Sequence, residues 1–309
     1  MMPVLNDKIR RQVKPEWLKI KLHDGAGFAE VAHIVEAHGL HTICSSGKCP
    51  NKAECWSRKT ATFMILGGIC TRGCKFCATP TGRPLPIEPS EPQRVAESIR
   101  LMGLRHAVIT SVDRDDLPDG GAEHWRQTIE AVKAINPNTT VEVLLPDFDG
   151  RDELVDLVMS ARPHIAGHNL ETIRRITPQV RSKAQYDTSL HTLARIAESG
   201  TPAKSGLMVG LGESHEEVVE ALRDLREAGV EIVTLGQYLR PTAKHLPVER
   251  YVSPEEFDEW KREALEMGFK YVASAPLVRS SYLADEAVGA CVGNRNNSTG
   301  AEERECDKE

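Results

Sequence analysis

The stretch that decides the fold is "TATFMILGGICTRGCKFCATPTG", residues 60–82. It begins with a run of apolar and β-branched residues, 60–66, that predicts a buried strand. Directly after this strand, Cys70, Cys74 and Cys77 lie within eight positions. Three thiols so close together predict a metal site, although zinc and an iron–sulfur cube usually take four ligands. The source of the fourth ligand is therefore open.

Beyond this stretch the chain alternates predicted strands and helices. The β-rich runs are 106–111, 140–145, 164–169, 204–210, 231–237 and, as one more possible strand, 271–275. Between them the apolar residues repeat on one helical face, and Ser214 with Glu217 and Ser90 with Gln93 are typical of helix starts. Such alternation implies right-handed parallel crossovers, so six units form an open doubly wound sheet or a barrel. In either case the working site lies at the carboxyl ends of the strands, where the cysteines fall.

Composition is that of an ordinary globular protein and excludes several classes. The net charge of −6 over 309 residues argues against a nucleic-acid scaffold, which usually carries a strong basic excess. No apolar run has the length of a membrane span, and the polar N-terminus lacks the apolar core of a signal peptide. We therefore expect a cytoplasmic protein with neither a nucleic acid nor a membrane as partner.

The eight cysteines favour metal binding over disulfides. Six of them lie between positions 44 and 77 of a long chain without an export signal. Cys291 and Cys306 stand apart, and we interpret both as ordinary thiols. A second triplet, Cys44, Cys49 and Cys55 in "CSSGKCPNKAEC", precedes the strand.

Spacing alone leaves two kinds of site open. Structural zinc sites favour paired knuckles with four ligands, which neither triplet reproduces. An iron–sulfur cube bound through three of its irons fits the spacing better, and its fourth iron then stays open to a small molecule.

The first triplet, C-x3-C-x2-C after the first strand of a βα series, is similar to the signature of the radical S-adenosylmethionine (SAM) enzymes. The resemblance implies that Cys70, Cys74 and Cys77 hold a [4Fe–4S] cluster. In that family the open iron binds the amino and carboxylate groups of SAM. SAM itself would then be the missing fourth ligand of this triplet.

Taken together, "CSSGKCPNKAECW" and "TATFMILGGICTRGCKFCA" resemble the lipoyl synthases. The resemblance continues through "TSVDRDDLPDGGAEHW", "VEVLLPDF", "HNLETIRR", "QYLRPTAKHLPVERYV" and "PLVRSSYLA", nearly the whole chain. It implies that Cys44, Cys49 and Cys55 hold an auxiliary [4Fe–4S] cluster with Ser281 of the R-S-S-Y motif as fourth ligand. Because an oxygen ligand is harder than a thiolate, we expect this iron bond to be labile, as suits a cluster consumed as a sulfur donor.

The same resemblance implies a partial (β/α)6 TIM-like barrel of the radical SAM type with N- and C-terminal extensions. We expect four regions along the chain. The extension 1–59 carries the auxiliary cysteines, 60–275 forms the barrel, 276–293 brings the serine ligand, and 294–309, which has no apolar face, is expected to be a disordered tail.

The activity implied by the resemblance is SAM-dependent radical insertion of two sulfur atoms at C6 and C8 of a protein-bound octanoyl-lysine. The implied partners are an octanoylated lipoyl carrier domain or H protein, an electron donor such as ferredoxin or flavodoxin, and an iron–sulfur carrier that repairs the auxiliary cluster. Two alternatives remain at this point: another sulfur-inserting radical SAM enzyme similar to biotin synthase, and a non-enzymatic zinc-binding module.

Contacts to SAM are expected from five further residues. Phe76 in the cysteine loop is a candidate to lie against the adenine, and Gly120 and Gly121 would allow close backbone approach. Asn169 and Glu171 at the end of a strand are candidates for the SAM ribose or amino group, with a helix start as the rival role of Glu171.

The basic segment "KIRRQVKPEWLKIKL", residues 8–22, allows two interpretations. It either contacts an acidic protein partner or is merely solvated.

Overall fold

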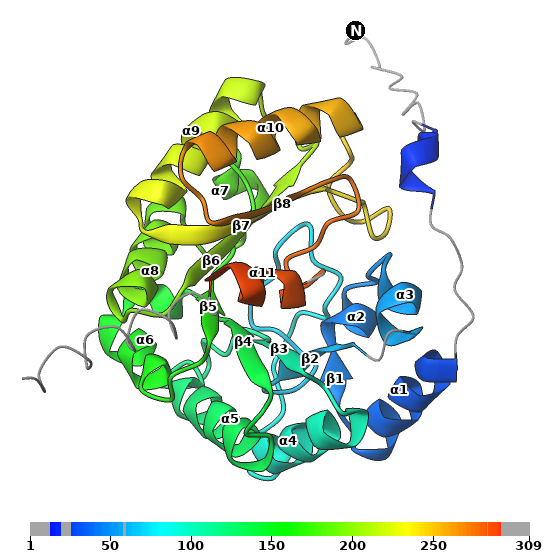
Figure 1. Cartoon of the computed structure of the whole chain (residues 1–309), viewed down its shortest axis with the longest axis vertical. Coiled ribbons are helices and arrows are strands. Elements are labelled where there is room, and N and C mark those ends of the chain that lie inside the picture. The colour runs from blue at the N-terminus through cyan, green and yellow to red at the C-terminus, as the bar shows by residue number, and fades with distance from the viewer. Residues whose placement is uncertain (1–12, 20–25, 58–59, 283, 292–309) are drawn as a thin grey trace, which may run out of the picture.

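The computed structural model describes residues 13–19, 26–57, 60–282 and 284–291 of the chain. Its centre is an eight-stranded sheet in the order β1 to β8, in which β1 is antiparallel to β2 and all other neighbours are parallel (Figure 1). The strands are β1 His41–Thr42, β2 Thr62–Ile65, β3 His106–Ser111, β4 Thr140–Leu144, β5 Ile165–Gly167, β6 Ala203–Val209, β7 Val230–Gln237 and β8 Tyr271–Ser274.

Helices follow the strands in turn and cover the outer face of the curved sheet (Figure 1). The helices are η1 Glu16–Leu18, α1 Ala26–Ala37, α2 Ile43–Ser46, α3 Lys52–Ser57, α4 Glu91–Met102, α5 Ala122–Ile135, η2 Phe148–Gly150, α6 Asp152–Met159, α7 Thr177–Val180, α8 Tyr186–Glu198, α9 His215–Glu227, α10 Pro254–Glu266 and α11 Ala284–Cys291. Six strand–helix units from β2 to α10, followed by β8, confirm the expected partial (β/α)6 barrel.

Local sequence explains where some of the helices begin. The Ser214 hydroxyl accepts a hydrogen bond from the main-chain N–H of Glu217, and the Glu217 side chain caps in return, as expected for α9. Ser90 occupies the predicted N-cap position of α4 but does not cap the helix with its side chain. Its backbone is already helical (φ −85°, ψ −7°) and its side chain makes no capping bond. Its hydroxyl instead accepts from the Arg94 guanidinium at 3.3 Å.

The barrel is open, because β1 and β8 are the two edges of the sheet. Helix α11 lies in the middle of the ring in Figure 1, and its Cys291 packs against Ile165 and Ile232 near the amino ends of β5 and β7. The C-terminal helix therefore fills the end of the barrel away from the carboxyl ends of the strands. The expected tail 294–309 lies outside the described residues.

Among the described residues, no helix is both long and apolar enough to cross a bilayer.

Candidate functional site

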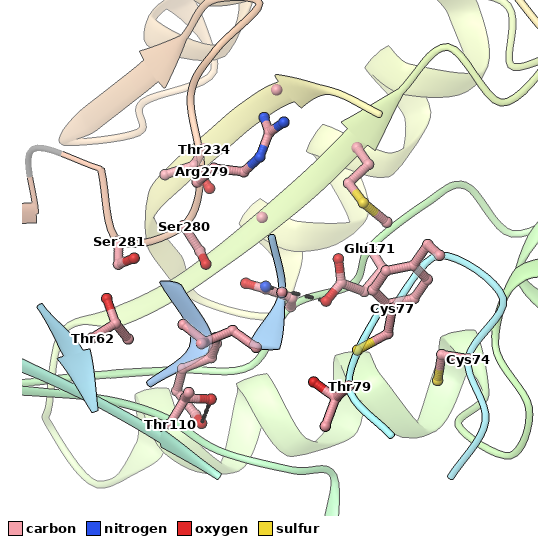
Figure 2. Close-up of a pocket in the computed structure, with 18 of the residues that line it drawn as sticks. Thr62, Cys74, Cys77, Thr79, Thr110, Glu171, Thr234, Arg279, Ser280 and Ser281 are labelled. Atoms are coloured by element: carbon pink, nitrogen blue, oxygen red, sulfur yellow. Dashed lines mark hydrogen bonds between the residues drawn. The ribbon is translucent and has the colours of Figure 1, made fainter. Parts of the chain in front are cut away.

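A cavity of about 530 Å³ opens at the carboxyl ends of the strands. Its walls come from the cysteine loop after β2, the turn after β3, the end of β5 and the segment after β8. In Figure 2, Ser280 and Ser281 lie on one side of the pocket and Cys74 and Cys77 on the other, with Glu171 between them in this view. The barrel thus gathers both candidate cluster segments at one cavity.

The cysteine loop is held by its main chain. The N–H of Cys70 donates to the Pro80 carbonyl at 2.9 Å, and the N–H of Lys75 donates to the Val180 carbonyl at 2.9 Å. The His245 ring contacts the carbonyl of Cys77 at 2.9 Å. These bonds to distant segments fix the loop, and all three of its thiols line the cavity.

Burial disfavours the thiolate forms of Cys70 and Cys77 in the absence of a metal. It raises the pKa of Cys70 to about 12, with a further contribution from the Asp113 carboxylate, and it also raises the pKa of Cys77. A metal centre that replaces the protons would relieve this cost, since the thiolate is the ligand form. The donor set therefore fits an iron–sulfur cluster.

Arg72, inside the loop, is the anchor of an ionic network. Its guanidinium bonds both carboxylate oxygens of Asp115 at 2.8 and 2.9 Å and reaches Asp147 at 2.8 Å, while only 4% of its side chain is exposed. Lys183 adds a second cation to Asp115 at 3.0 Å. Although burial alone would raise the pKa of Asp115, hydrogen bonds from Arg72 and Lys183 hold it well below its usual range.

The upstream thiols gather where α2 and α3 meet. Cys44 lies on α2 and Cys55 on α3, and the main-chain N–H of Cys49 donates to the Cys44 carbonyl at 3.2 Å. Burial, reinforced by the neighbouring thiols, raises the pKa of Cys55 to about 12 and also raises that of Cys49. The three thiols therefore lie within electrostatic reach of one another. All seven cysteines in the described ranges are free thiols, as a metal-binding protein requires.

The segment that carries Ser281 packs against this second triplet. The side-chain amide of Asn51 donates to the Leu277 carbonyl at 2.8 Å, and the Tyr282 hydroxyl donates to Glu54 at 3.1 Å. Ser281 lies between these two contacts and lines the cavity. Gly236 of β7 permits this approach, because a Cβ there would lie 2.1 Å from the Val278 carbonyl oxygen.

Unpartnered polar atoms lie at the end of β5 and after β3. Asn169 Oδ1 and Ser111 Oγ are buried and lack a hydrogen-bond partner among the described residues. Glu171 is held at a left-handed φ of 70°, its carboxylate lies in the cavity wall, and burial raises its pKa. The alternative role of Glu171 at a helix start is not supported, because the next helix begins only at Thr177. These polar groups fit a polar ligand such as the amino-acid part of SAM.

Gly120 and Gly121 lie outside the lining of the cavity. Both have a left-handed backbone, and a Cβ on Gly121 would lie 2.6 Å from the Leu66 side chain. Leu66 belongs to the turn that leads from β2 into the cysteine loop. Their placement thus favours support of this turn over the expected contact with SAM, whereas Phe76 does line the cavity.

Sequence reasoning missed three residues of this site: Arg72, His245 and Arg279. Arg279 lines the cavity, and its charge works against the larger effect of burial on the pKa of Cys49. Arg72 and Arg279 offered a signal, since each is a basic residue beside a candidate ligand. His245 offered none, because its contact with Cys77 spans 168 positions.

Comparisons with known proteins agree with this geometry. The model of the radical SAM superfamily matches residues 64–237. A lipoyl synthase of Parabacteroides distasonis is 62% identical over 275 residues, covering 89% of this chain and 98% of the relative. A lipoyl synthase of Bacteroides fragilis is 61% identical over 283 residues, covering 92% and 98%. A lipoyl synthase of Treponema denticola is 54% identical over 277 residues, covering 90% and 96%.

Solved structures support the fold. Streptococcus suis SuiB bound to S-adenosylmethionine matches with a TM-score of 0.56 at 11% identity, covering 72% of this chain and 54% of that one. HydG, a maturase of the [FeFe]-hydrogenase, matches with a TM-score of 0.51 at 13% identity, covering 80% and 68%. At such low identity the likeness concerns the fold alone.

Proposed function

The chain belongs to the lipoyl synthase family of radical SAM enzymes, and from this premise we propose that it inserts sulfur at C6 and C8 of an octanoyl chain carried on a lysine of a lipoyl carrier domain. Relatives about 60% identical over nearly their whole length support this reaction above the alternatives left open by spacing. The observation that carries it has two parts. The first triplet and Ser281 line one cavity, and the Ser281 segment is bonded to the segment that carries the second triplet.

We assign the ligands residue by residue. Cys70, Cys74 and Cys77 hold a [4Fe–4S] cluster whose remaining position takes SAM. A second cluster is held by the upstream triplet, Cys44, Cys49 and Cys55, together with Ser281. The chemistry these groups supply when bound is reductive cleavage of SAM and donation of sulfur.

The protein contributes binding, orientation and exclusion of water. Asn169 and Glu171 present polar atoms to SAM from the end of β5, with Phe76 on the cavity wall beside Cys77. The His245 contact and the Arg72 network keep the cysteine loop in place. Holding the reactants in one partly closed cavity shortens the path of any radical and keeps solvent from it.

Ser281 is the residue on which sulfur donation depends. A hydroxyl oxygen is a harder ligand than a thiolate, so its bond to iron should break more readily. We expect Ser281→Cys to keep its iron but to lose turnover. Ser280→Ala, a change at the neighbouring serine of the same cavity wall, serves as the control and should retain turnover. Full turnover of Ser281→Cys would contradict the role.

The direct test is an anaerobic assay with SAM, a reductant and an octanoylated carrier domain, read by mass spectrometry. We expect a carrier heavier by two sulfur atoms less the hydrogens they replace, and no sulfur-bearing product would refute the proposal. Iron and sulfide analysis tests the cluster count independently: about eight irons per chain for two cubes, against zinc without sulfide for the zinc alternative.

Further partners are proposed on the same basis. A protein such as ferredoxin or flavodoxin supplies electrons, the carrier is a lipoyl domain or H protein, and an iron–sulfur carrier restores the consumed cluster. We divide the chain functionally into the extension 1–59, the barrel 60–275 and the serine-bearing segment 276–293. Free thiols that bind clusters need reducing surroundings, which supports a reaction in the cytoplasm.

A further inference from the structure

Exposed cations line the opening of the cavity. Lys14, Lys48 and Arg240 are exposed, and each contributes to the cavity wall. In the ranges that the structure describes, none of the three pairs with a carboxylate, and the Arg240 guanidinium donates only to the main-chain carbonyls of His245 and Ala243. Some exposed arginines elsewhere are neutralised locally, for example Arg175 by Glu217 at 2.7 Å.

Two more cations lie on the adjoining loops. Lys75 is an exposed residue of the cysteine loop, and its carbonyl accepts from the N–H of Leu246 at 3.2 Å. Lys244 is exposed next to His245, whose ring touches the carbonyl of Cys77. Neither ammonium group has an ion-pair partner within the described part of the chain. Five uncompensated positive charges therefore surround the entrance of a protein whose net charge is −6.

The segment 13–19, whose Lys14 lines the cavity, also exposes apolar side chains. In the segment 13–19, Val13 is 90% exposed and Trp17 is 44% exposed, whereas Leu18 is buried and fixes the segment. Five large hydrophobic side chains are exposed among the described residues, and two of them belong to these seven positions. An exposed tryptophan beside unpaired cations is typical of a protein-binding surface.

We propose that Lys14, Lys48, Lys75, Arg240 and Lys244, together with Val13 and Trp17, form a docking surface for an acidic carrier protein. We call these seven residues the entrance surface. The inference rests on the proposed function, because the acyl chain is attached to a lysine of a folded protein and enters the cavity only if that protein docks at its rim. Because the chain as a whole is acidic, a local positive surface steers an acidic partner to the entrance.

The test compares charge reversals on two faces. The double variant Lys14→Glu/Lys244→Glu changes exposed residues that touch no candidate ligand side chain. Lys261→Glu on α10 is the matched control. Lys261 is exposed, lies outside the lining of the cavity and has no ion-pair partner among the described residues. Each reconstituted enzyme is assayed with the octanoylated carrier domain and with a short neutral octanoyl-lysine peptide. A small chemical reductant replaces any protein electron donor.

At low ionic strength the double variant should raise KM for the carrier roughly tenfold, and the salt dependence of this KM should weaken. Its kcat/KM should fall much less for the peptide than for the carrier, and all constants of Lys261→Glu should match the parent. Trp17→Ala should raise KM for the carrier at every salt concentration, since it removes an apolar contact.

Three results would overturn the inference. One is that the double variant and Lys261→Glu change the KM for the carrier by the same factor. Another is a parallel loss with the neutral peptide, which would indicate damage to the cavity. The last is a loss of binding to anionic lipid vesicles with an unchanged KM for the carrier. If the parent enzyme thiolated neither substrate, the proposed function itself would fall, and the docking inference with it.

Discussion

Replacing Arg72 with methionine removes the only arginine of the cysteine loop and leaves its partners charged. Asp147 is the critical one, because only 1% of its side chain is exposed and its carboxylate lies 2.8 Å from the guanidinium. Burial disfavours its charged form, while His168 and Arg72 lower its pKa. Burial also lowers the pKa of His168 to about 4, so Arg72 is the counter-charge that remains at neutral pH.

The expected cost follows from this geometry. Removing one partner of a buried ion pair destabilises a protein by about 3–5 kcal/mol, because the other charge stays buried without compensation. For a chain of 309 residues this lowers Tm by roughly 6–10 °C, at about 2 °C per kcal/mol. Because Arg72 lies between Cys70 and Cys74, the loosened loop should also take up less iron.

The matched control is Lys183→Met, which removes a cation from the same cluster at a side chain that is 43% exposed. A surface pair contributes about 0–1 kcal/mol, so Tm should fall by no more than about 2 °C. Thermal unfolding by circular dichroism, on cluster-free and reconstituted protein, separates lost ion pairs from lost clusters. Arg72→Met/Asp147→Asn should recover part of the loss. Equal Tm values for Arg72→Met and Lys183→Met would refute the reasoning.

Two further predictions use other features of the site. Gly236→Ala places a methyl group 2.1 Å from the Val278 carbonyl oxygen, so it should displace the serine segment and lower the iron content of the second site. Gly289→Ala is the control, because open space surrounds Gly289, and it should take up iron normally. Iron analysis and electron paramagnetic resonance compare the two variants. The lowered pKa values of Asp115 and Asp147 stabilise the folded state. This stability is complete above the unfolded pKa of about 4 and is lost as pH falls through the folded pKa values. The free energy of unfolding of the cluster-free protein should therefore fall more steeply in acid than that of Asp147→Asn.

The barrel could be predicted from sequence because its signals are local. Each parallel strand is a short buried run, and each helix shows one apolar face, as on α9 from Ser214 to Glu227. β1 and α11 escaped prediction for a physical reason. A strand of two residues and a helix of eight residues owe their place to tertiary packing, on β2 and inside the barrel.

The site could be predicted only where residue type and spacing along the chain indicate its chemistry. Cysteines show their spacing in the sequence, whereas an ion pair such as Arg72 with Asp147 joins positions 75 apart. Glycine marks only a need for close approach, so the expected contact of Gly120 and Gly121 with SAM stays a prediction. Sequence does not say whether the approaching group is a ligand or, as here, the side chain of Leu66.

The open edge of the sheet explains how a ligand from residue 281 can serve cysteines near residue 50. Residues 43–57 directly follow β1, residues 276–282 directly follow β8, and these strands are the two edges of the sheet. Bonds from Asn51 to Leu277 and from Tyr282 to Glu54 join the two segments. A fully closed barrel would pair its edges by strand hydrogen bonds and leave no gap for such segments to meet. The incomplete barrel therefore lets the segment that carries Ser281 reach the second candidate cluster site.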